Sequence, residues 1–360
     1  MSNKKKVLII QAAVQHYRIP IFNELAKTVD LLVVYDKGVV PTGAKFASKK
    51  VDVINIKDKL WIHKKNMIRM AKKHDVVISM LDSSCLTTRL LCKFRGKTKL
   101  ILWGIGVAAS YGVRFDSLLG SALSYRKMIN QADAALFYSQ YPVDKYSKMG
   151  VSESKLFVAN NTVQVLPIEE RERNSILFVG SLYRAKKIFE LLECYKKAHS
   201  ECDNLPVLVI IGDGEDAEPV KNWVKENHYE RQIHLPGAIY DEKKLSEYFS
   251  ESIICISPDQ AGLSVLKSFG YGVPFVTHKD AITGGERLNI ENGVNGVLFD
   301  SFEEITEIIK DCAYHAVRYV EMGKRAKKHY DENRTVSHMV GGFIDAINFV
   351  TGKQKTGAGD

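Results

Sequence analysis

The sequence predicts an α/β fold of two Rossmann-like domains, each a doubly wound parallel sheet, with a cleft between them. Two observations predict it. Short β-branched runs alternate with longer amphipathic segments in both halves of the chain, and this alternation gives parallel sheets with helices on both faces. The 360 residues, of which 45% are hydrophobic, are enough to fill two cores. Because ligands bind beyond the carboxyl ends of parallel strands, we expect the chemistry in the cleft.

The elements follow in chain order from the β-branched and the amphipathic runs. In the first half the predicted strands are Val7–Ile10, Leu31–Tyr35, Val76–Met80, Leu100–Trp103 and Ala135–Tyr138. In the second half they are Ile176–Val179, Val207–Ile211, Gln232–Leu235, Ile253–Ser257 and Pro274–Thr277. Helices are predicted between them, among others at Ile188–His199, Ala217–Glu226 and Lys243–Phe249.

A polar segment at Gln164–Asn174 predicts the boundary between the domains, because its charged run ends abruptly at the next β-branched run. We expect a first domain over residues 1–165 and a second over 172–335. A last amphipathic segment, about 336–350, follows the second sheet and can pack back on the first domain. The Gly- and Lys-containing tail Thr351–Asp360 is expected to be disordered.

The charge balance favours acidic partners. The 51 Lys and Arg against 42 Asp and Glu leave a net charge of +9, which suits phosphates, anionic lipid or nucleic acid. The chain has no helix-turn-helix, RNA-binding pattern or arginine cluster, so nucleic acid is not expected. It has no His-x-x-x-His or Asp-x-Asp spacing, so we expect no metal.

The cysteine pattern and the start of the chain favour the cytoplasm. The six cysteines include no Cys-x-x-Cys pair, and the basic residues after Met1 lead straight into the first strand without a signal peptide. No apolar run approaches the ~20 residues of a spanning helix. We therefore expect free buried thiols in a reducing compartment.

Two loops after predicted strands of the second half carry candidate anion ligands. Gly180 allows a tight exit from the first strand, and Arg184, Lys186 and Lys187 follow near a helix start, where cations suit a bound anion. A solvated basic turn explains the same residues. After the fourth strand, a helix beginning near Gly262 would present its amides to an anion. Equally, Asp259 or Ser257 could act as its cap.

Together with the Pro236-Gly237 turn between them, and in this order and spacing, these features resemble the donor-binding domain of retaining glycosyltransferase family four, which has the GT-B fold. The resemblance covers about Ile176–Phe299. It implies that Lys186 contacts the donor diphosphate and that Asp259 holds a donor-sugar hydroxyl, as the two catalytic positions. The implied donor-binding positions are Gly180, Ser181, Arg184, Gly237, Ala238, Ala261, Gly262, Leu263, Ser264 and Lys267.

The sequence departs from the family pattern at two of these positions. Ser181 stands where the family has an arginine, and Arg184 is a candidate replacement. Lys267 stands where the family has its second glutamate, so it cannot accept bonds from ribose hydroxyls, although it could bind phosphate. Glu286 in Thr283-Gly-Gly-Glu286 could supply the missing acceptor, but this tetrapeptide also fits a capping box, which we favour.

The first half resembles polysaccharide-building members of the same family more loosely. His16, Tyr17 and Arg18 follow the first strand and are expected to face the acceptor, although a cap or packing role fits His16 as well. Trp103-Gly-Ile-Gly106 resembles a Trp-Gly-His-Gly segment of relatives, which makes Gly106 an acceptor-side candidate. Ile105 stands where the histidine would be, but a retaining mechanism in which the leaving phosphate takes the acceptor proton needs no such base.

The resemblance implies a function. The expected reaction moves a hexose from a nucleotide sugar to a glycan or polyprenyl-diphosphate-linked acceptor, with retention, and requires neither metal nor cofactor. The pathway would be bacterial surface polysaccharide synthesis, such as lipopolysaccharide or capsule. The protein would be cytoplasmic and peripheral at the inner face of the cell membrane. The alternative is a catalytically inactive GT-B subunit that binds a membrane or a partner.

One basic segment bears on the membrane. Lys57–Lys73 interleaves lysines and arginine with Trp61 and other apolar residues, and Lys93–Lys99 adds more positive charge. An anionic membrane surface explains this pattern, and so does a solvated helix face with its apolar side in the core.

Overall fold

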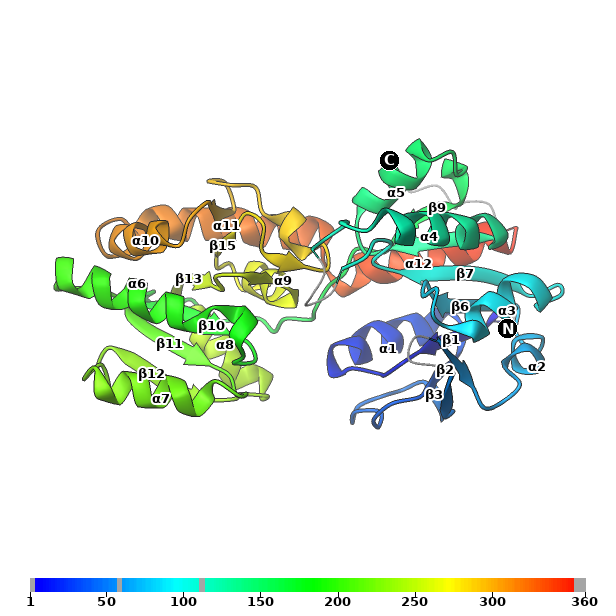
Figure 1. The fold of residues 1–360 in the computed structure, drawn as a ribbon, viewed down its shortest axis with the longest axis horizontal. Helices are drawn as coiled ribbons and strands as arrows, with labels where there is room; N and C mark the ends of the chain where they lie inside the picture. The colour runs from blue at the N-terminus through cyan, green and yellow to red at the C-terminus, as the bar shows by residue number, and fades with distance from the viewer. Residues whose placement is uncertain (1–3, 57–59, 110–113, 353–360) are drawn as a thin grey trace. The chain divides into compact units, whose positions relative to one another are not determined.

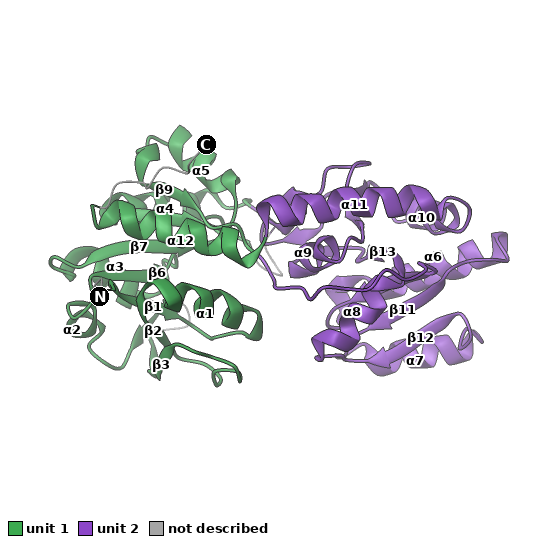
Figure 2. Ribbon diagram, turned by 180° about the vertical axis from the view of Figure 1, so that it is seen from behind, with its two compact units in different colours: residues 1–109, 116–161, 335–360 green, residues 110–115, 162–334 purple. Residues whose placement is uncertain are grey.

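The computed structural model describes residues 4–56, 60–109 and 114–352. They form two compact units, which Figure 2 shows in different colours. Unit 1 contains residues 4–56, 60–109, 116–161 and 335–352, and unit 2 contains residues 114–115 and 162–334. Each unit holds its own parallel sheet, so the expected fold class is confirmed. The chain passes from unit 1 to unit 2 at Thr162, slightly before the polar segment expected to separate them.

The sheet of unit 1 has seven parallel strands in the order β3-β2-β1-β6-β7-β8-β9. They are β1 (Lys6–Gln11), β2 (Asp30–Tyr35), β3 (Ala47–Lys50), β6 (Val76–Met80), β7 (Lys99–Gly104), β8 (Ala134–Phe137) and β9 (Leu156–Val158). A separate antiparallel pair is formed by β4 (Val53–Ile56) and β5 (Leu60–His63). The strand order changes direction at β1, which is the doubly wound pattern that the sequence predicts.

Helices cover both faces of this sheet because successive residues of each strand point to opposite sides. Val7 and Ile9 pack with helices α1 (Ile19–Thr28) and α12 (Val336–Val350). Leu8 and Ile10 pack in the cluster on the other face. The helices of that face are α2 (Met67–Ala71), α3 (Leu86–Phe94), α4 (Leu119–Gln131) and α5 (Gln140–Lys148). The last helix α12 therefore belongs to the core of unit 1, as the sequence allowed.

The sheet of unit 2 has six parallel strands in the order β12-β11-β10-β13-β15-β17. They are β10 (Ser175–Val179), β11 (Val207–Ile211), β12 (Ile233–Gly237), β13 (Ser252–Ile256), β15 (Phe275–His278) and β17 (Gly296–Phe299). A short parallel pair, β14 (Gln260–Ala261) with β16 (Ile282–Thr283), lies outside this sheet. The strand order again changes direction at the first strand of the unit, β10.

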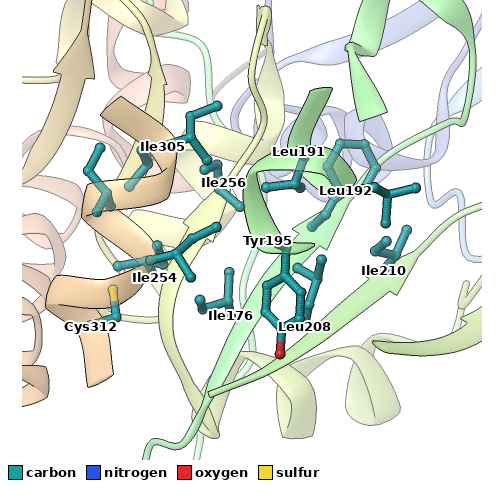
Figure 3. Packing of buried hydrophobic residues seen from close by; sticks show 14 of the residues in the cluster. Ile176, Leu191, Leu192, Tyr195, Leu208, Ile210, Ile254, Ile256, Ile305 and Cys312 are labelled. Atoms are coloured by element: carbon teal, nitrogen blue, oxygen red, sulfur yellow. The ribbon is translucent and has the colours of Figure 1, made fainter. Parts of the chain in front are cut away.

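The helices of unit 2 also lie on both faces. On one face pack α6 (Ile188–Glu201), α7 (Ala217–Glu226) and α10 (Glu303–Tyr314), and on the other pack α8 (Glu242–Ser250) and α9 (Leu263–Gly270). Helix α11 (Ala316–Asn333) gives residues to both clusters. Figure 3 shows the first cluster, in which Leu191 and Tyr195 of α6 pack against Ile176 of β10. Each fully buried aliphatic side chain of this kind stabilises the fold by roughly 1.5–3 kcal/mol.

The basic segment Lys57–Lys73, which contains β5 and α2, does not form one amphipathic helix. Of the residues that the structure describes there, Trp61 lies in β5, and the following helix is only five residues long. Its apolar residues Met67 and Ala71 are buried, while Lys64, Lys65 and Arg69 are exposed. Residues 57–59, at the start of the segment, lie outside the described residues. The packing thus favours the solvated face with an inward apolar side over insertion of these apolar residues into a membrane.

The cysteines, the helix lengths and the carboxyl-terminal tail were also subjects of the sequence predictions. All six cysteines are free, and five of them are buried. Among the described helices, none combines the length and hydropathy that a membrane span requires. The tail predicted to be disordered begins at Thr351, and its residues 353–360 lie outside the described residues.

Candidate donor site

The loop after β10 turns Lys186 back toward the end of its own strand. Residues Arg184–Lys186 form a single 3-10 turn, closed by the Lys186 amide donating to the Tyr183 carbonyl at 2.8 Å. Lys187 then adopts φ 56°, a left-handed conformation that is rare for a residue with a side chain, and α6 begins directly after it. Strained backbone of this kind is concentrated at ligand sites. The turn and the kink together place Lys186 inside the unit.

Lys186 is a cation that the fold buries almost completely. Its side chain is 7% exposed, and burial lowers its pKa from 10.5 to about 8, partly offset by the Cys255 thiol. Within residues 4–56, 60–109 and 114–352, no carboxylate forms an ion pair with it. A buried ammonium is costly unless an anion compensates it. The site is therefore preorganised for a negatively charged ligand.

Glycines without room for a side chain shape this corner of the unit. A Cβ on Gly180 would lie 3.2 Å from the Lys186 Nζ, so Gly180 leaves space for the ammonium group. A Cβ on Gly212 would lie 1.9 Å from the Gly180 carbonyl oxygen, and one on Gly214 would lie 2.2 Å from that of Leu182. Gly212 and Gly214 were not among the predicted site residues, although they are the first and third residues after the predicted strand Val207–Ile211.

Helix α9 presents an uncapped amino terminus. Gly262 is its N-cap, and among the described residues no side chain caps it, so neither Asp259 nor Ser257 does so. A Cβ on Gly262 would meet nothing within 4 Å, which shows open space beside the backbone. The next residues, Leu263 and Ser264, are half-buried. Free helix amides with open space in front of them suit an oxyanion.

Asp259 lies in the loop between β13 and α9 as a half-buried carboxylate. Burial raises its pKa, while the nearby charges of His278 and Lys187 lower it. In the described part of the chain, no hydrogen bond is made to its carboxylate oxygens. The Asp259 carboxylate is thus available to accept a hydrogen bond from a hydroxyl of a ligand, which is the role that the resemblance implies.

Lys267 is not free to bind phosphate. Its ammonium donates to both carboxylate oxygens of Glu242, at 2.8 and 2.6 Å, and the Tyr271 hydroxyl donates to Glu242 at 2.6 Å. The expectation that Lys267 binds a phosphate is therefore wrong for this arrangement. Glu242, the first residue of α8, was not among the candidates. It brings a carboxylate beside the position where the family has its second glutamate.

Glu286 does not form the capping box that we favoured, because the 3-10 turn Glu286–Asn289 has Gly285 as its N-cap and no side-chain cap hydrogen bond; its carboxylate is held by the preceding turn instead. Its carboxylate accepts from the Gly284 amide at 3.0 Å, and the Thr283 hydroxyl accepts from the amides of Gly285 and Arg287 at 3.0 and 3.1 Å. Glu286 is also 7% exposed. Its side chain is buried and bonds to the preceding Thr283–Gly284 backbone segment, so it is not presented to a ligand.

The remaining donor-side candidates lie on loops of unit 2. Gly237 ends β12 with φ 79° and open space around its Cα, whereas Ala238 and Ser181 are exposed and Ala261 is fully buried in β14. Arg184 is exposed and lines a cavity of about 680 Å³ together with Lys187 and residues of α6 and α10. Lys186 does not line that cavity, so the structure does not bring Arg184 and Lys186 to one hollow.

Arg18 of unit 1 is a core residue. It is 5% exposed, and its guanidinium lies 4.9 Å from the ring centre of Trp103 and 5.1 Å from those of Tyr17 and Tyr138. It donates to the Tyr138 hydroxyl at 2.9 Å and to the Met339 sulfur at 3.5 Å. The expectation that Arg18 faces an acceptor is therefore wrong, because its donors are used in packing β7, β8 and α12 together.

Of the other residues expected on the acceptor side, His16 is exposed and Tyr17 is half-buried. Gly106 has a structural role instead. It has φ 81°, and a Cβ there would lie 2.6 Å from both Phe137 and Pro142. His16 and Tyr17 remain candidates for acceptor contact.

The buried lysine, the open helix terminus and the free carboxylate all belong to one segment of the chain. Residues 164–329 match the family model described as "Glycosyl transferases group 1". Unit 2 is therefore similar to the group 1 glycosyltransferases over most of its length. The residues described above as donor-side candidates all fall within this matched range.

Known proteins show the same similarity. The chain is 25% identical over 213 residues to an uncharacterized glycosyltransferase of Methanocaldococcus jannaschii, covering 57% of this chain and 50% of the relative. It is 28% identical over 126 residues to the amylovoran biosynthesis glycosyltransferase AmsD of Erwinia amylovora, covering 34% of each chain. The chain thus spans half or less of the length of these curated relatives.

The fold extends over the whole chain. The structure of HepE from Anabaena in complex with UDP and glucose matches with a TM-score of 0.68 at 13% identity, covering 96% of this chain and 99% of that chain. At this identity the likeness shows the fold alone. The chain therefore has the GT-B fold.

Proposed function

We propose that the protein is a glycosyltransferase that moves a hexose from a nucleoside-diphosphate sugar to a glycan or lipid-linked acceptor. The observation that carries the proposal is the buried Lys186 ammonium, which no carboxylate of the described residues compensates. The similarity of unit 2 to the group 1 glycosyltransferases and the UDP and glucose bound by HepE support a nucleotide sugar as the missing anion.

The chemistry follows from these side chains. As the bond between the anomeric carbon and the leaving oxygen breaks, negative charge grows on the nucleoside diphosphate. A pre-placed ammonium and helix amides stabilise this charge without a metal. A bond forms between the acceptor oxygen and the anomeric carbon on the same face, and the acceptor proton passes to the leaving diphosphate. The Asp259 carboxylate accepts a hydrogen bond from a hydroxyl of the donor sugar and thereby orients the sugar.

Glu242 is the proposed substitute for the carboxylate that position 267 lacks. Its Oε1 atom accepts from Lys267 and Tyr271, and Oε2 accepts from Lys267, so Oε2 retains a lone pair for a ribose hydroxyl. The side chain is 34% exposed. Lys267 then orients the acceptor of the ribose hydroxyl and does not contact the nucleotide.

The acceptor and the setting are part of the same proposal. The name of AmsD, an amylovoran biosynthesis glycosyltransferase, supports a role in bacterial surface polysaccharide synthesis. The proposed acceptor is a growing glycan or a polyprenyl-diphosphate-linked sugar. The proposed site of action is the cytoplasm, at the inner face of the cell membrane.

The test measures thermal stabilisation by UDP, GDP and other nucleoside diphosphates, followed by sugar transfer from the sugar nucleotide of the base that binds. Ligand that binds only the native state raises its melting temperature. Lys186→Ala should lose most of the stabilisation and the transfer, and Lys225→Ala, which removes an exposed lysine of α7, should lose neither. Full transfer by Lys186→Ala would refute the proposal. Nucleotide binding without transfer to any acceptor would favour a non-catalytic subunit.

A further inference from the structure

A second basic site lies in unit 1, at the edge of the sheet where the strands begin. A cavity of about 540 Å³ is lined there by Lys5, Lys72, His74, Asp75, Lys97 and Lys99, among others. Lys5, Asp75 and Lys99 stand at the starts of β1, β6 and β7, which are neighbours in the sheet. Helices α2 and α3 lie side by side near this edge (Figure 1), and Lys72 and Lys97 follow their carboxyl ends. The donor-side residues of unit 2 take no part in it.

Most of the positive charge around this cavity is not compensated. Lys99 pairs with Asp133 at 3.4 Å, and the Asp75 carboxylate accepts from the Lys6 amide at 2.8 Å. For Lys5, Lys72 and Lys97, no ion pair is formed with any residue of the described ranges. Three lysines thus surround a hollow that contains one carboxylate, which already accepts a backbone hydrogen bond. Such a site attracts an anion with several oxygen atoms.

Apolar side chains stand beside these lysines and face solvent. Phe94, the last residue of α3, is 57% exposed, and Leu90, one turn earlier, is 37% exposed. Phe94 precedes Lys97 by three residues, and a Cβ on Gly96 would lie 3.6 Å from the Lys72 side chain. The exposed apolar residues thus stand at the end of α3 directly before the segment that carries Lys97 into the lysine cavity.

Segment 83–99, which contains α3, has no Asp or Glu but five Lys or Arg residues: Arg89, Lys93, Arg95, Lys97 and Lys99. Arg95 and Lys99 pair with Asp133, and Arg89, Lys93 and Lys97 are exposed. A soluble anion needs only the cations. Exposed Leu and Phe beside cations fit a surface that is both anionic and apolar, which is the boundary of a bilayer that contains anionic lipid.

We propose that this lysine cavity binds the phosphate headgroup of an anionic phospholipid, with Leu90 and Phe94 inserted at the bilayer surface. Lys5, Lys72 and Lys97 donate to the phosphate oxygens. The proposal deepens the proposed function, on whose membrane setting it rests, because it names the surface of unit 1 that would hold the protein there; it requires no nucleotide.

The experiment measures co-sedimentation of the full chain with vesicles of phosphatidylcholine, with and without phosphatidylglycerol. Binding is expected only with phosphatidylglycerol, and it should weaken as salt rises. The combined variant Lys5→Gln, Lys72→Gln, Lys97→Gln should bind about 100-fold more weakly, from about 1 kcal/mol per near-surface lysine. The control Lys148→Gln, Lys225→Gln, Lys243→Gln removes the same charge from exposed positions elsewhere and should bind nearly as the parent.

A second variant tests the apolar part and the source of the phosphate. Leu90→Ser with Phe94→Ser should weaken vesicle binding about tenfold while the lysines remain. Equal loss in the charge-matched control, unchanged binding in the lysine variant, or saturable binding of inorganic phosphate without vesicle binding would each overturn the proposal. Thermal stabilisation by the nucleotide should be the same in all these variants, so a failure here is distinct from a failure of the proposed function.

Discussion

Each unit buries one cation that no carboxylate of the described residues compensates, and the two differ in their surroundings. Arg18 of unit 1 is 5% exposed, and Lys186 of unit 2 is 7% exposed. Arg18 lies among three aromatic rings and donates to a hydroxyl and a sulfur. Lys186 has a glycine at its ammonium group and a fully buried thiol nearby, and its pKa falls to about 8.

The difference separates a structural cation from a binding cation. Aromatic faces attract a guanidinium, and a hydroxyl accepts its hydrogen bond, so the fold itself stabilises the charge of Arg18. The depressed pKa of Lys186 means that the fold does not stabilise that charge equally well. A ligand with negative charge would do so. Burial of a cation is thus not evidence of a site until its partners are known.

The largest expected effect is a loss of stability when Arg18, the structural cation, is replaced. Arg18→Met should lower the free energy of unfolding by about 2–4 kcal/mol, because it removes the contacts that join β7, β8 and α12. Urea unfolding measures it. Arg231→Met, a change at an exposed position, should stay within about 0.5 kcal/mol of the parent. An Arg18→Met protein of normal stability with impaired sugar transfer would instead place Arg18 in the acceptor site.

The next largest effect is a pH dependence of nucleotide affinity, which follows from the protonation of Lys186. Only protonated Lys186 attracts the diphosphate, so affinity for a nucleoside diphosphate should fall by up to about tenfold per unit as the pH rises above 8. Calorimetry between pH 7 and about pH 9.5 measures it. Lys186→Arg, whose guanidinium stays protonated in this range, should show a nearly flat profile. A steep profile in that variant would assign the titration to another group.

A smaller effect is expected at Glu242. Glu242→Gln removes the negative charge beside Lys267, and affinity for the nucleotide should fall by about fivefold, corresponding to roughly 1 kcal/mol. A 2′-deoxy and 3′-deoxy nucleotide pair identifies the hydroxyl involved, because its removal should matter in the parent and not in the variant. Equal losses in both proteins would leave Glu242 a purely structural partner of Lys267.

The sequence predicted most strands of the two sheets because buried parallel strands are rich in β-branched residues. All ten strands expected from such runs are present, from β1 to β15. β3 was missed because its residues Ala47–Lys50 are all exposed and carry no apolar signal. β9 is only three residues long, which is too short for a periodic pattern.

The candidate site was predictable where it depends on local spacing and not where it depends on tertiary contacts. The spacing of Gly180, Lys186 and Gly262 pointed to an anion site, and the structure buries Lys186 and leaves the amides at Gly262 uncapped. The pairing of Lys267 with Glu242, 25 residues earlier in the chain, depends on how α8 packs near α9. The burial of Arg18 likewise depends on α12, far along the chain.

The most direct test is a melting experiment on the parent and Lys186→Met, each with and without the nucleoside diphosphate. In the folded state the pKa of Lys186 is about 8, against 10.5 for the free side chain, so the ligand-free fold loses stability as the pH falls from 10.5 to 8 and bears the full cost of the buried charge below pH 8. At pH 7 the ligand-free variant should therefore melt a few degrees higher than the parent, and the nucleotide should stabilise the parent far more than the variant. A variant that melts lower without ligand, and gains as much from the nucleotide as the parent does, would contradict the assignment of Lys186 as the cation that binds the diphosphate.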